Sequence, residues 1–529
     1  MLKKLPTAVT ALVLALSLTV APVHAGIPTN PNTGGIPGSW TSGTSPAAID
    51  PNKPAILFVH GLNGSAKTWY DGNDMYQKAY DAGYQTAFIN LHDITGTSQS
   101  MWDNGELLAG KIKEISQHFG KKLVIVAHSK GGVDTQSALV HYNAYPYVSN
   151  VITLGSPHHG SQLADLAYSD WAGWLATAIG YQSPGTASVQ TSYMSYFRSV
   201  TDNHVNAGKN KVYTFAGNNF SNGSFTHFLG GLYLEDFGPN DGVVTVSSAH
   251  LPGGKMVNVG NWNHTSIKTG TATFNLLKPY LVLQTANAKQ NLVEIASPPK
   301  KVLDGDQSGV SSFIRGGQHS GSASETFTVE NAVYSVKLDW IGSTPLTKLD
   351  IVAPDGSVES VPVQPVEDTG IFAGAWHHTA TLSNPSPGEW TITAGSDGPA
   401  AYLFTAAYEA GGPSKVKVKR GSDGKKLKVE ADGLKNGRTQ VQYSVDFVET
   451  DAKSDKLKKK APKISKPKRI KQKERLVSPA EELAIPTVEG AGIYNVTAEI
   501  EGETESGHKF RRTLVKSIYV DEQGNTYSN

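Results

Sequence analysis

Short apolar runs that alternate with longer amphipathic stretches dominate the chain from residue 51 to residue 285. Residues 55–59, 85–91, 123–127, 151–154, 212–216 and 256–259 form the apolar runs. Such runs are typical of strands buried on both faces of a mostly parallel sheet. The stretches at 68–82, 104–119, 131–145 and 270–281 have the apolar spacing of helices. This order of strands and helices predicts an α/β domain over residues 51–285.

The periodicity changes after residue 286, where hydrophobic and polar residues begin to alternate. The first clear run contains Tyr334, Val336, Leu338 and Trp340. Similar alternation returns near residues 390–394, 441–447 and 494–500. Period-2 alternation with turn residues between the runs predicts two β-sandwich-like modules, over residues 286–412 and 413–529.

Composition sets wider limits on the class of protein. The chain has 529 residues, more than one hydrophobic core usually supports, and no cysteine. The absence of cysteine excludes disulfide frameworks, thiol catalysis and cysteine-based metal sites. The formal net charge is only +1. The charges are unevenly distributed, however, because residues 453–475 contain twelve lysines and arginines against Asp455 and Glu474, a net charge of +10.

The N-terminus has the pattern of a secretory signal peptide. Lys3 and Lys4 precede an apolar run at 8–20, and Val23-His24-Ala25 resembles a cleavage site with small residues. A membrane anchor is the alternative, but the run is short against the roughly 20 apolar residues that span a bilayer. We therefore expect a signal peptide over residues 1–25, a secreted protein and no transmembrane segment in the mature chain. Residues 26–50 are rich in Gly, Pro, Ser, Thr and Asn and predict a flexible segment.

A candidate nucleophile follows the predicted strand at 123–127. The sequence Ala127-His128-Ser129-Lys130-Gly131 is a nucleophile elbow of the G-x-S-x-G type with alanine first. Small residues two positions before and after the serine permit the sharp turn from strand to helix that exposes the hydroxyl. The alternative interpretation is a serine that caps a helix.

The loop after the first strand, His60-Gly61-Leu62-Asn63-Gly64, is placed to complete an oxyanion hole. We expect the backbone N–H groups of Leu62 and Lys130 to be the two donors, with their side chains incidental. His60 is an alternative general base, but it precedes the serine. In this arrangement the acid and then the histidine follow the nucleophile.

The acid and base are expected on loops after later strands. Asp241 lies in the turn-rich segment Gly238-Pro239-Asn240-Asp241-Gly242, and Asp236 is its rival. His264 follows the last predicted strand, and His250 is the competing histidine. The predicted triad is therefore Ser129, Asp241 and His264, acting through an acyl-enzyme.

These motifs in this order resemble those of secreted bacterial lipases with the α/β-hydrolase fold. The resemblance rests on the elbow, the His60-Gly61-Leu62 loop, the segment 154–160 (LGSPHHG), the segment 240–244 (NDGVV) and Trp262-Asn263-His264. The alanine-first elbow is similar to that of Bacillus-type lipases. The resemblance implies an ester hydrolase and covers residues 51–281, not the β modules.

The sequence departs from some relatives in its metal-binding residues. Thr265 and Ser266 follow His264, where Pseudomonas-type lipases have a calcium-binding aspartate. His158 and His159 are adjacent and would point apart, so they do not form a zinc ligand set. We therefore expect no metal and no cofactor.

Two further segments have open interpretations. Residues 161–200 are rich in aromatic residues, notably between Tyr168 and Phe197, and predict either a lid or acyl-binding wall, or ordinary packing against the sheet. Residues 453–475 predict an exposed basic loop. This loop binds an anionic cell-surface polymer or lipid rather than nucleic acid, or it is simply a solvated loop with no ligand.

The function that fits these features best is a secreted carboxylester hydrolase, namely a triacylglycerol lipase. One alternative is an extracellular depolymerase of polyesters such as polyhydroxyalkanoates, which also join a lipase-box domain to β modules. Another is a surface-binding protein with a vestigial hydrolase domain. A complete Ser-Asp-His order argues against the last of these.

Overall fold

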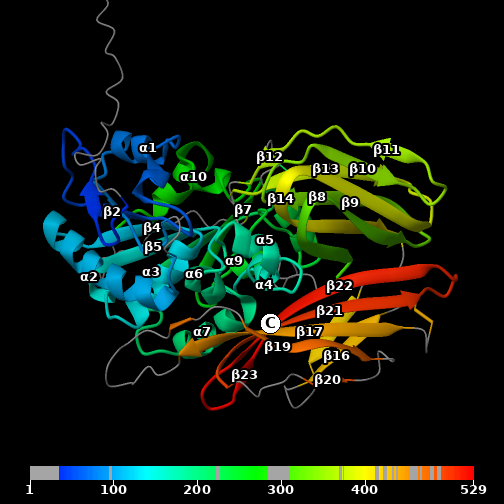
Figure 1. The fold of residues 1–529 in the computed structure, drawn as a ribbon. Coiled ribbons are helices and arrows are strands. Elements are labelled where there is room, and N and C mark those ends of the chain that lie inside the picture. The colour runs from blue at the N-terminus through cyan, green and yellow to red at the C-terminus, as the bar shows by residue number, and fades with distance from the viewer. Residues whose placement is uncertain are drawn as a thin grey trace, which may run out of the picture.

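The computed structural model describes residues 35–94, 98–221, 227–283, 310–368, 372, 374–411, 416–420, 426–431, 434–435, 439–451, 463–464, 468–476, 482–484 and 490–528. The predicted signal peptide at 1–25 lies outside these residues. Figure 1 shows an α/β domain with two β modules packed side by side against it. We call residues 310–411 the first β module and residues 416–528 the second β module.

The α/β domain is built on a seven-stranded sheet with strand order β1-β3-β2-β4-β5-β6-β7. Its strands are β1 Trp40–Ser42, β2 Ala55–Val59, β3 Thr86–Ile89, β4 Leu123–His128, β5 Val148–Leu154, β6 Lys211–Gly217 and β7 Lys255–Gly260. All neighbours are parallel except β1, which pairs antiparallel with β3. The predicted mostly parallel sheet is confirmed. Strand β1, however, lies in the segment for which the sequence predicts flexibility.

Both faces of this sheet are covered, which explains the continuous apolar runs. Ile56 and Phe58 of β2 pack in one cluster with α1 Met75–Asp81 and α10 Gly270–Leu277. Their neighbours on the same strand, such as Leu57, pack in another cluster with α2 Met101–Phe119 and α3 Lys130–Val140. Helix α2 begins at the cap Ser100 and ends at Gly120, whose φ of 64° suits glycine.

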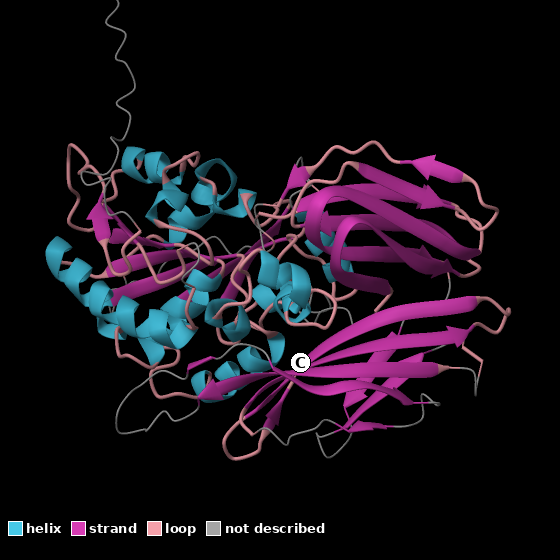
Figure 2. Cartoon of the chain, viewed as in Figure 1, coloured by secondary structure: helices cyan, strands magenta, loops and turns pink. Residues whose placement is uncertain are grey.

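Short helices make up the rest of the α/β domain (Figure 2). They are α4 Gln162–Ala167, α5 Gly173–Ala178, α6 Pro184–Ser188, α7 Thr191–Thr201, α8 Phe228–Glu235 and α9 Val246–Ala249. Four short 3-10 helices are η1 Ala66–Trp69, η2 Tyr145–Tyr147, η4 Ser266–Lys268 and η5 Lys278–Tyr280. Helices α4–α7 occupy the aromatic segment at 161–200, which is therefore a chain of short helices rather than one long helix.

The first β module is one antiparallel sheet that bends over itself. Its strands are β8 Ser312–Val329, β9 Val333–Gly342, β10 Lys348–Val352, β11 Val358–Ser360, β12 Val366–Glu367, β13 Trp376–Ser383 and β14 Gly388–Ala410. The register between β14 and β8 shifts between Gly395 and Pro399. The part of β14 before this bulge in the sequence pairs with β10, and the part after it pairs with β9. A bulge of this kind bends long strands so that both halves share one core.

The second β module contains two antiparallel sheets. Its strands are β15 Val416–Arg420, β16 Lys426–Ala431, β17 Gln440–Asp451, β18 Lys463–Ile464, β19 Lys468–Leu476, β20 Glu482–Ala484, β21 Gly492–Glu503, β22 Lys509–Val520 and β23 Thr526–Tyr527. The alternating residues predicted to face the core, such as Val441 and Phe447 of β17, are buried.

The basic segment at 453–475 is not one loop, as predicted, because part of it lies in the sheet. Strand β19 pairs antiparallel with β17, with Arg469 opposite Asp446 and Lys471 opposite Val445. Residues 452–462 and 465–467 lie outside the described residues. The prediction of an exposed loop over residues 453–475 is therefore wrong for residues 463–464 and 468–475, where backbone pairing with β17 outweighs the repulsion between like charges.

Both β modules pack on helices α4–α7 of the α/β domain. One hydrophobic cluster joins Leu163, Tyr193 and Phe197 to Leu403 of the first module and Tyr519 of the second. Polar contacts add to it, since Asp170 N donates to Thr497 Oγ1 at 2.9 Å and Gln190 Nε2 donates to Asn495 Oδ1 at 2.6 Å. The aromatic segment is thus an interface with the modules in the intact chain, which favours the packing interpretation over a mobile lid.

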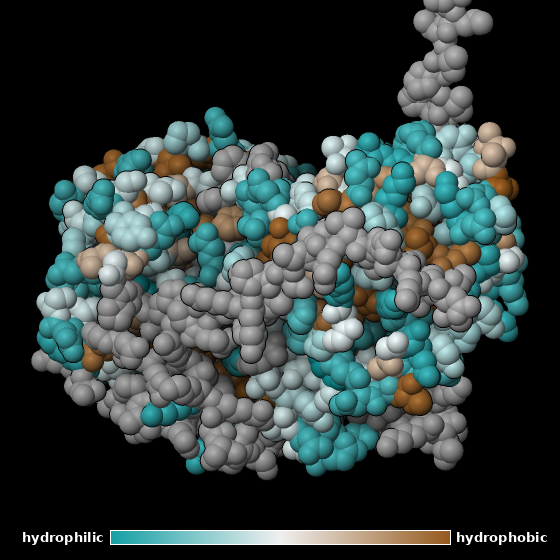
Figure 3. Space-filling view, turned by 180° about the vertical axis from the view of Figure 1, so that it is seen from behind, coloured by the Kyte–Doolittle hydropathy of each residue, from teal (hydrophilic) through white to brown (hydrophobic). Residues whose placement is uncertain are grey.

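Among the residues that Figure 3 colours by hydropathy, most are hydrophilic, and the hydrophobic ones lie in small groups. Within the described residues, the helices are all too short or too polar to cross a bilayer.

Candidate active site

Ser129 stands on a strained turn between β4 and α3. Its φ of 54° and ψ of −135° are unusual for a residue other than glycine. The turn is tightly packed, because the glycines two and three residues after the serine lie close to other parts of the chain. A Cβ atom on Gly131 would lie 2.3 Å from the carbonyl oxygen of His60, and one on Gly132 would lie 2.2 Å from Oγ of Ser156. The local geometry is that of a nucleophile elbow.

The loop after β2 approaches this serine closely. A Cβ atom on Gly61 would lie 2.6 Å from Cβ of Ser129, so only glycine fits there. Leu62 and Lys130, the two predicted donors, line the same cavity as Ser129. This cavity has a volume of about 160 Å³.

His60 has a structural role in this loop. It is fully buried, its Nδ1 lies 2.8 Å from the carbonyl oxygen of Gly61, and its Nε2 accepts from the Leu91 N–H at 3.0 Å. Acceptance at Nε2 places the ring proton on Nδ1, where it is donated to Gly61. Burial lowers the pKa of His60, which keeps the ring neutral. With both nitrogens occupied, His60 is not placed to act as the general base.

Asp241 and His264 form a buried pair at the carboxyl end of the sheet. His264 Nδ1 donates to Asp241 Oδ2 at 2.7 Å. The other oxygen, Oδ1, accepts from the N–H groups of Val243 and Val244 at 2.9 and 2.7 Å. Asp241 is therefore held as an acceptor on both oxygens, and in a neutral imidazole that donates from Nδ1 the lone pair is on Nε2. His264 lines the cavity together with Ser129.

The two rival residues lie elsewhere. Asp236 accepts from the Ser311 and Ser312 hydroxyls at 2.6 and 3.0 Å, and so holds the start of the first β module. His250 ends helix α9. Among the described residues, the histidines that line the cavity are His128, His227 and His264. A larger cavity of about 300 Å³ lies against another face of α3 and contains neither Ser129 nor His264.

Two residues that support His264 are missing from the sequence prediction. His128 Nε2 donates to the backbone oxygen of His264 at 2.8 Å, and burial holds the pKa of His128 well below its usual value. Gly155 has a φ of 58°, and a Cβ atom there would lie 2.9 Å from Asp241 Oδ2 and 3.3 Å from His264 Nδ1. The only signal for these roles in the sequence is that each residue lies in a motif that resembles the lipases.

The side chain of Lys130, which the sequence analysis treats as incidental, is part of a buried ion-pair network. It is 0% exposed, and its Nζ lies 2.8 Å from Asp93 Oδ2 and 2.7 Å from Asp134 Oδ1, both also fully buried. Burial alone lowers the pKa of Lys130, but the two carboxylates outweigh it and raise the pKa. Lysine is rarely fully buried without such partners.

The described residues contain no group of three or more His, Cys, Asp or Glu side chains arranged to hold a metal ion. His158 Nε2 contacts Thr153 Oγ1 at 3.2 Å. The expectation that no metal or cofactor takes part stays a prediction.

Comparison with known proteins identifies relatives for the α/β domain and for the whole chain. Residues 50–169 match the model of the PGAP1-like alpha/beta domain. The chain is 30% identical over 133 residues to a triacylglycerol lipase of Burkholderia plantarii, a match of 24% of this chain and 37% of that protein. A triacylglycerol lipase of Pseudarthrobacter phenanthrenivorans matches at 30% identity over 21% of this chain and 35% of its own length. The chain therefore spans about a third of the length of these curated relatives.

Among solved structures, that of the lipase BlEst2 of Bacillus licheniformis in its propeptide form aligns with a TM-score of 0.74 and 36% identity, covering 93% of this chain and 100% of the other. The mature form of the same lipase is 51% identical over 47% of this chain and 100% of its own, with a TM-score of 0.44. Because the propeptide form is matched over its whole length, we conclude that the chain belongs to the lipase and esterase family of α/β-hydrolases, a family of carboxylic ester hydrolases.

Proposed function

We propose that this protein is a secreted triacylglycerol lipase in which Ser129 is the nucleophile, His264 the general base and Asp241 the acid. The observation that carries this proposal is the strained Ser129 turn in one cavity with a histidine whose Nδ1 is bound to a buried carboxylate. A strained residue with positive φ persists only where the contacts around it are strong enough to hold it in that conformation. Such residues cluster at functional sites.

In the proposed mechanism His264 Nε2 takes the proton from Ser129 as Oγ attacks the ester carbonyl. Asp241 keeps the imidazole in the required tautomer and stabilises its charged form. The backbone N–H groups of Leu62 and Lys130 receive the oxyanion. His264 then protonates the leaving alcohol, and water hydrolyses the acyl-enzyme by the same steps.

The substrate is tested by hydrolysis of emulsified tributyrin and triolein beside a polyhydroxybutyrate film. We expect hydrolysis of the triglycerides and loss of that activity in Ser129→Ala. Asp236→Asn and His250→Ala are matched controls, since these residues are the rivals of the proposed acid and base, and we expect them to retain the activity. Hydrolysis of the film alone would instead support the depolymerase alternative, which the comparisons do not favour.

Secretion is part of this proposal and rests on the N-terminal pattern at residues 1–25. Expression of the full chain in a bacterial host, followed by N-terminal sequencing of the protein in the medium, tests it. We expect the mature chain to begin at Gly26. Retention of the full-length chain in the cells would contradict the proposal.

We also propose that the β modules belong to a precursor form of this enzyme. The relative that covers 93% of this chain is described in its propeptide form. The ring of Phe372 in the first module lies 6.2 Å from the ring of Tyr181, which lines the cavity that contains Ser129. A protease site inserted within residues 284–309 allows the modules to be cut from the α/β domain. We expect cleavage to raise the rate on long-chain esters more than on short ones, and an unchanged ratio would contradict this.

The basic segment at 453–475 remains a proposed attachment site for an anionic cell-surface polymer or lipid. Its net charge of +10 supports electrostatic attraction that weakens with salt. Binding of the full chain to phosphatidylglycerol vesicles and to cell-wall teichoic acid, with and without six lysine-to-glutamine substitutions in this segment, tests it. Equal binding by both chains at low salt would contradict the proposal.

A further inference from the structure

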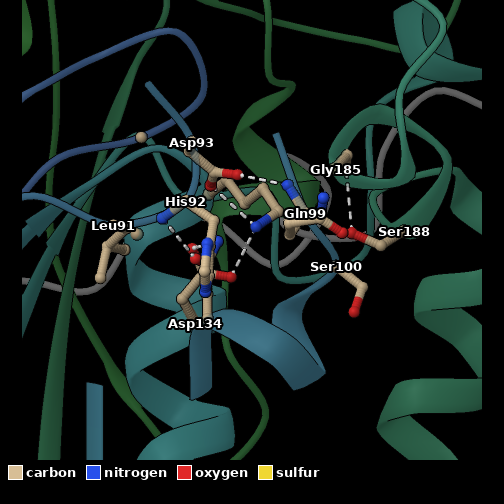
Figure 4. A network of polar contacts seen from close by, with 12 residues as sticks. Leu91, His92, Asp93, Gln99, Ser100, Asp134, Gly185 and Ser188 are labelled. Atoms are coloured by element: carbon tan, nitrogen blue, oxygen red, sulfur yellow. Dashed lines mark hydrogen bonds and ion pairs between the residues drawn. The ribbon is translucent and has the colours of Figure 1, made fainter. Parts of the chain in front are cut away.

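The side chain of Lys130, next to the proposed nucleophile, belongs to a buried polar network with Asp93 and Asp134 (Figure 4). Lys130 lies between Asp93, which follows strand β3, and Asp134, one turn further along helix α3. All three side chains are 0% exposed. The ammonium group of a surface lysine is hydrated and can move. That of Lys130 is bound to two buried carboxylates, which fix its position.

The network reaches the segment that follows β3 at two points. Asp93 Oδ1 accepts from the Gln99 N–H at 3.1 Å. Asp134 Oδ2 accepts from Asn104 Nδ2 at 3.2 Å, and Asn104 Oδ1 accepts from the His92 N–H at 3.0 Å. Helix α3, which begins at Lys130, is thus joined to this segment through charged and amide side chains.

The segment that follows β3 also contacts the loop at residues 60–64, which carries the proposed donor Leu62 and which we call the oxyanion loop. The Leu91 N–H donates to His60 Nε2 at 3.0 Å, and His60 Nδ1 donates to the carbonyl of Gly61, which precedes Leu62, at 2.8 Å. On its other side the segment packs with Leu62 around Gly185. A Cβ atom on Gly185 would lie 2.8 Å from Cβ of Ser98 and 2.9 Å from Cδ2 of Leu62. Both proposed amide donors are therefore joined to one buried network.

We infer that the Lys130 side chain is a positioning group that fixes the separation of the Leu62 and Lys130 amides, so that both reach the oxyanion. The inference rests on the function proposed above. An oxyanion hole works because its donors are fixed before the charge develops, and small displacements of such groups reduce the rate strongly. Asp93 is the partner that joins Lys130 directly to the segment behind the oxyanion loop.

The two carboxyl groups are not equivalent. Burial raises the pKa of Asp134 well above its usual value, Lys130 opposes this and Asp93 adds to it. Asp134 lies on the same helix as Lys130, whereas Asp93 lies in the segment that follows β3. Asp134→Asn is therefore a matched control for Asp93→Asn, because both substitutions are isosteric and only the second removes the direct ion pair to the segment that follows β3.

The experiment measures kcat and KM on p-nitrophenyl butyrate and the inhibition constant of an alkyl trifluoromethyl ketone, whose adduct with serine carries an oxyanion. For Asp93→Asn we expect kcat to fall about 10-fold or more, KM to stay within about 2-fold, and inhibitor binding to weaken in proportion to kcat. For Asp134→Asn we expect changes below about 3-fold. Equal effects of the two substitutions, or a lower kcat with unchanged inhibitor binding, would overturn the inference.

Two further variants separate positioning from stability. Lys130→Met/Asp93→Asn/Asp134→Asn removes all three charged groups of the network, so it leaves no new unpaired charge, and we expect the same loss of kcat as in Asp93→Asn. Glu330→Gln breaks the buried pair between Glu330 and Arg512, which joins the β modules. We expect it to lower the melting temperature and leave kcat unchanged. Absence of esterase activity in the unmodified chain, or its persistence in Ser129→Ala, would instead refute the proposed function.

Discussion

Within the part of the chain that the structure describes, two buried aspartate–histidine pairs have almost the same geometry, one in the α/β domain and one in the first β module. His264 Nδ1 lies 2.7 Å from Asp241 Oδ2, and His377 Nδ1 lies 2.8 Å from Asp339 Oδ2. The difference is at the second ring nitrogen. His377 Nε2 contacts another carboxylate, Asp368, at 3.1 Å, whereas His264 lines the cavity with Ser129.

This difference decides what each imidazole can do. Burial lowers the pKa of His377, but Asp339 and Asp368 outweigh it and raise the pKa to about 10. His377 is thus a permanent cation at neutral pH and joins β13 to the strand and loop that carry its two carboxylates. A histidine with one carboxylate and one open nitrogen can accept a proton, and one between two carboxylates cannot.

The largest expected effect is a loss of esterase activity on substitution of His264 but not of His377. His264→Gln should lower kcat/KM for p-nitrophenyl butyrate by about 10⁴-fold or more, since the proposed base is lost. The melting temperature should change little because the glutamine amide can still donate to Asp241. His377→Gln, the matched substitution in the other pair, should retain kcat/KM within about 3-fold.

The second effect is on stability. His377→Gln leaves Asp339 and Asp368 buried without a cation, and loss of one partner from a buried pair costs about 3–5 kcal/mol. The control is His378→Gln. His378 is also buried, but it is bound to the Trp340 carbonyl and the Leu346 N–H rather than to a carboxylate. Urea unfolding measures both, and a smaller loss for His377→Gln than for His378→Gln would refute the ionic role.

The pH dependence of stability follows from the sign of the His377 shift. Because its pKa is higher in the folded chain than the unfolded value of 6.5, the contribution is fully present below pH 6.5. It is lost progressively as the pH rises toward about 10. The difference in free energy of unfolding between the unmodified chain and His377→Gln should therefore shrink from pH 6 to pH 10. A constant or growing difference would contradict this.

The smallest expected effect is an absence of interfacial activation in the intact chain. Tyr193 packs edge-to-face on Tyr519 at 5.0 Å, and the aromatic segment 161–200 is largely buried beneath the β modules. We expect the rate on tributyrin to rise smoothly through its solubility limit. A sharp increase at that limit would show that the segment moves as a lid despite these contacts.

Much of the α/β domain could be predicted from local pattern. Five consecutive apolar residues, as in β2 and β4, leave few alternatives to a strand buried on both faces, and the glycines that follow Ser129 indicate a tight turn. The predicted helix at 68–82 was less accurate, because Gly72 has a φ of 63° and separates η1 from α1. Strand β1 was missed because it is an edge strand of three residues whose partner, β3, lies far along the chain.

The sequence by itself determined the elbow at Ser129, the candidates for the acid and the histidine, and the change from a 3.6-residue to a 2-residue period. Each of these depends on residues close together in the chain. Only the tertiary structure decided that Asp241 rather than Asp236 meets His264, that the aromatic segment is an interface, and that Lys130 is buried between Asp93 and Asp134. Those outcomes depend on burial and on contacts between distant segments. The sequence gives the type of a charged or aromatic side chain but not whether water, another domain or an ion-pair partner surrounds it.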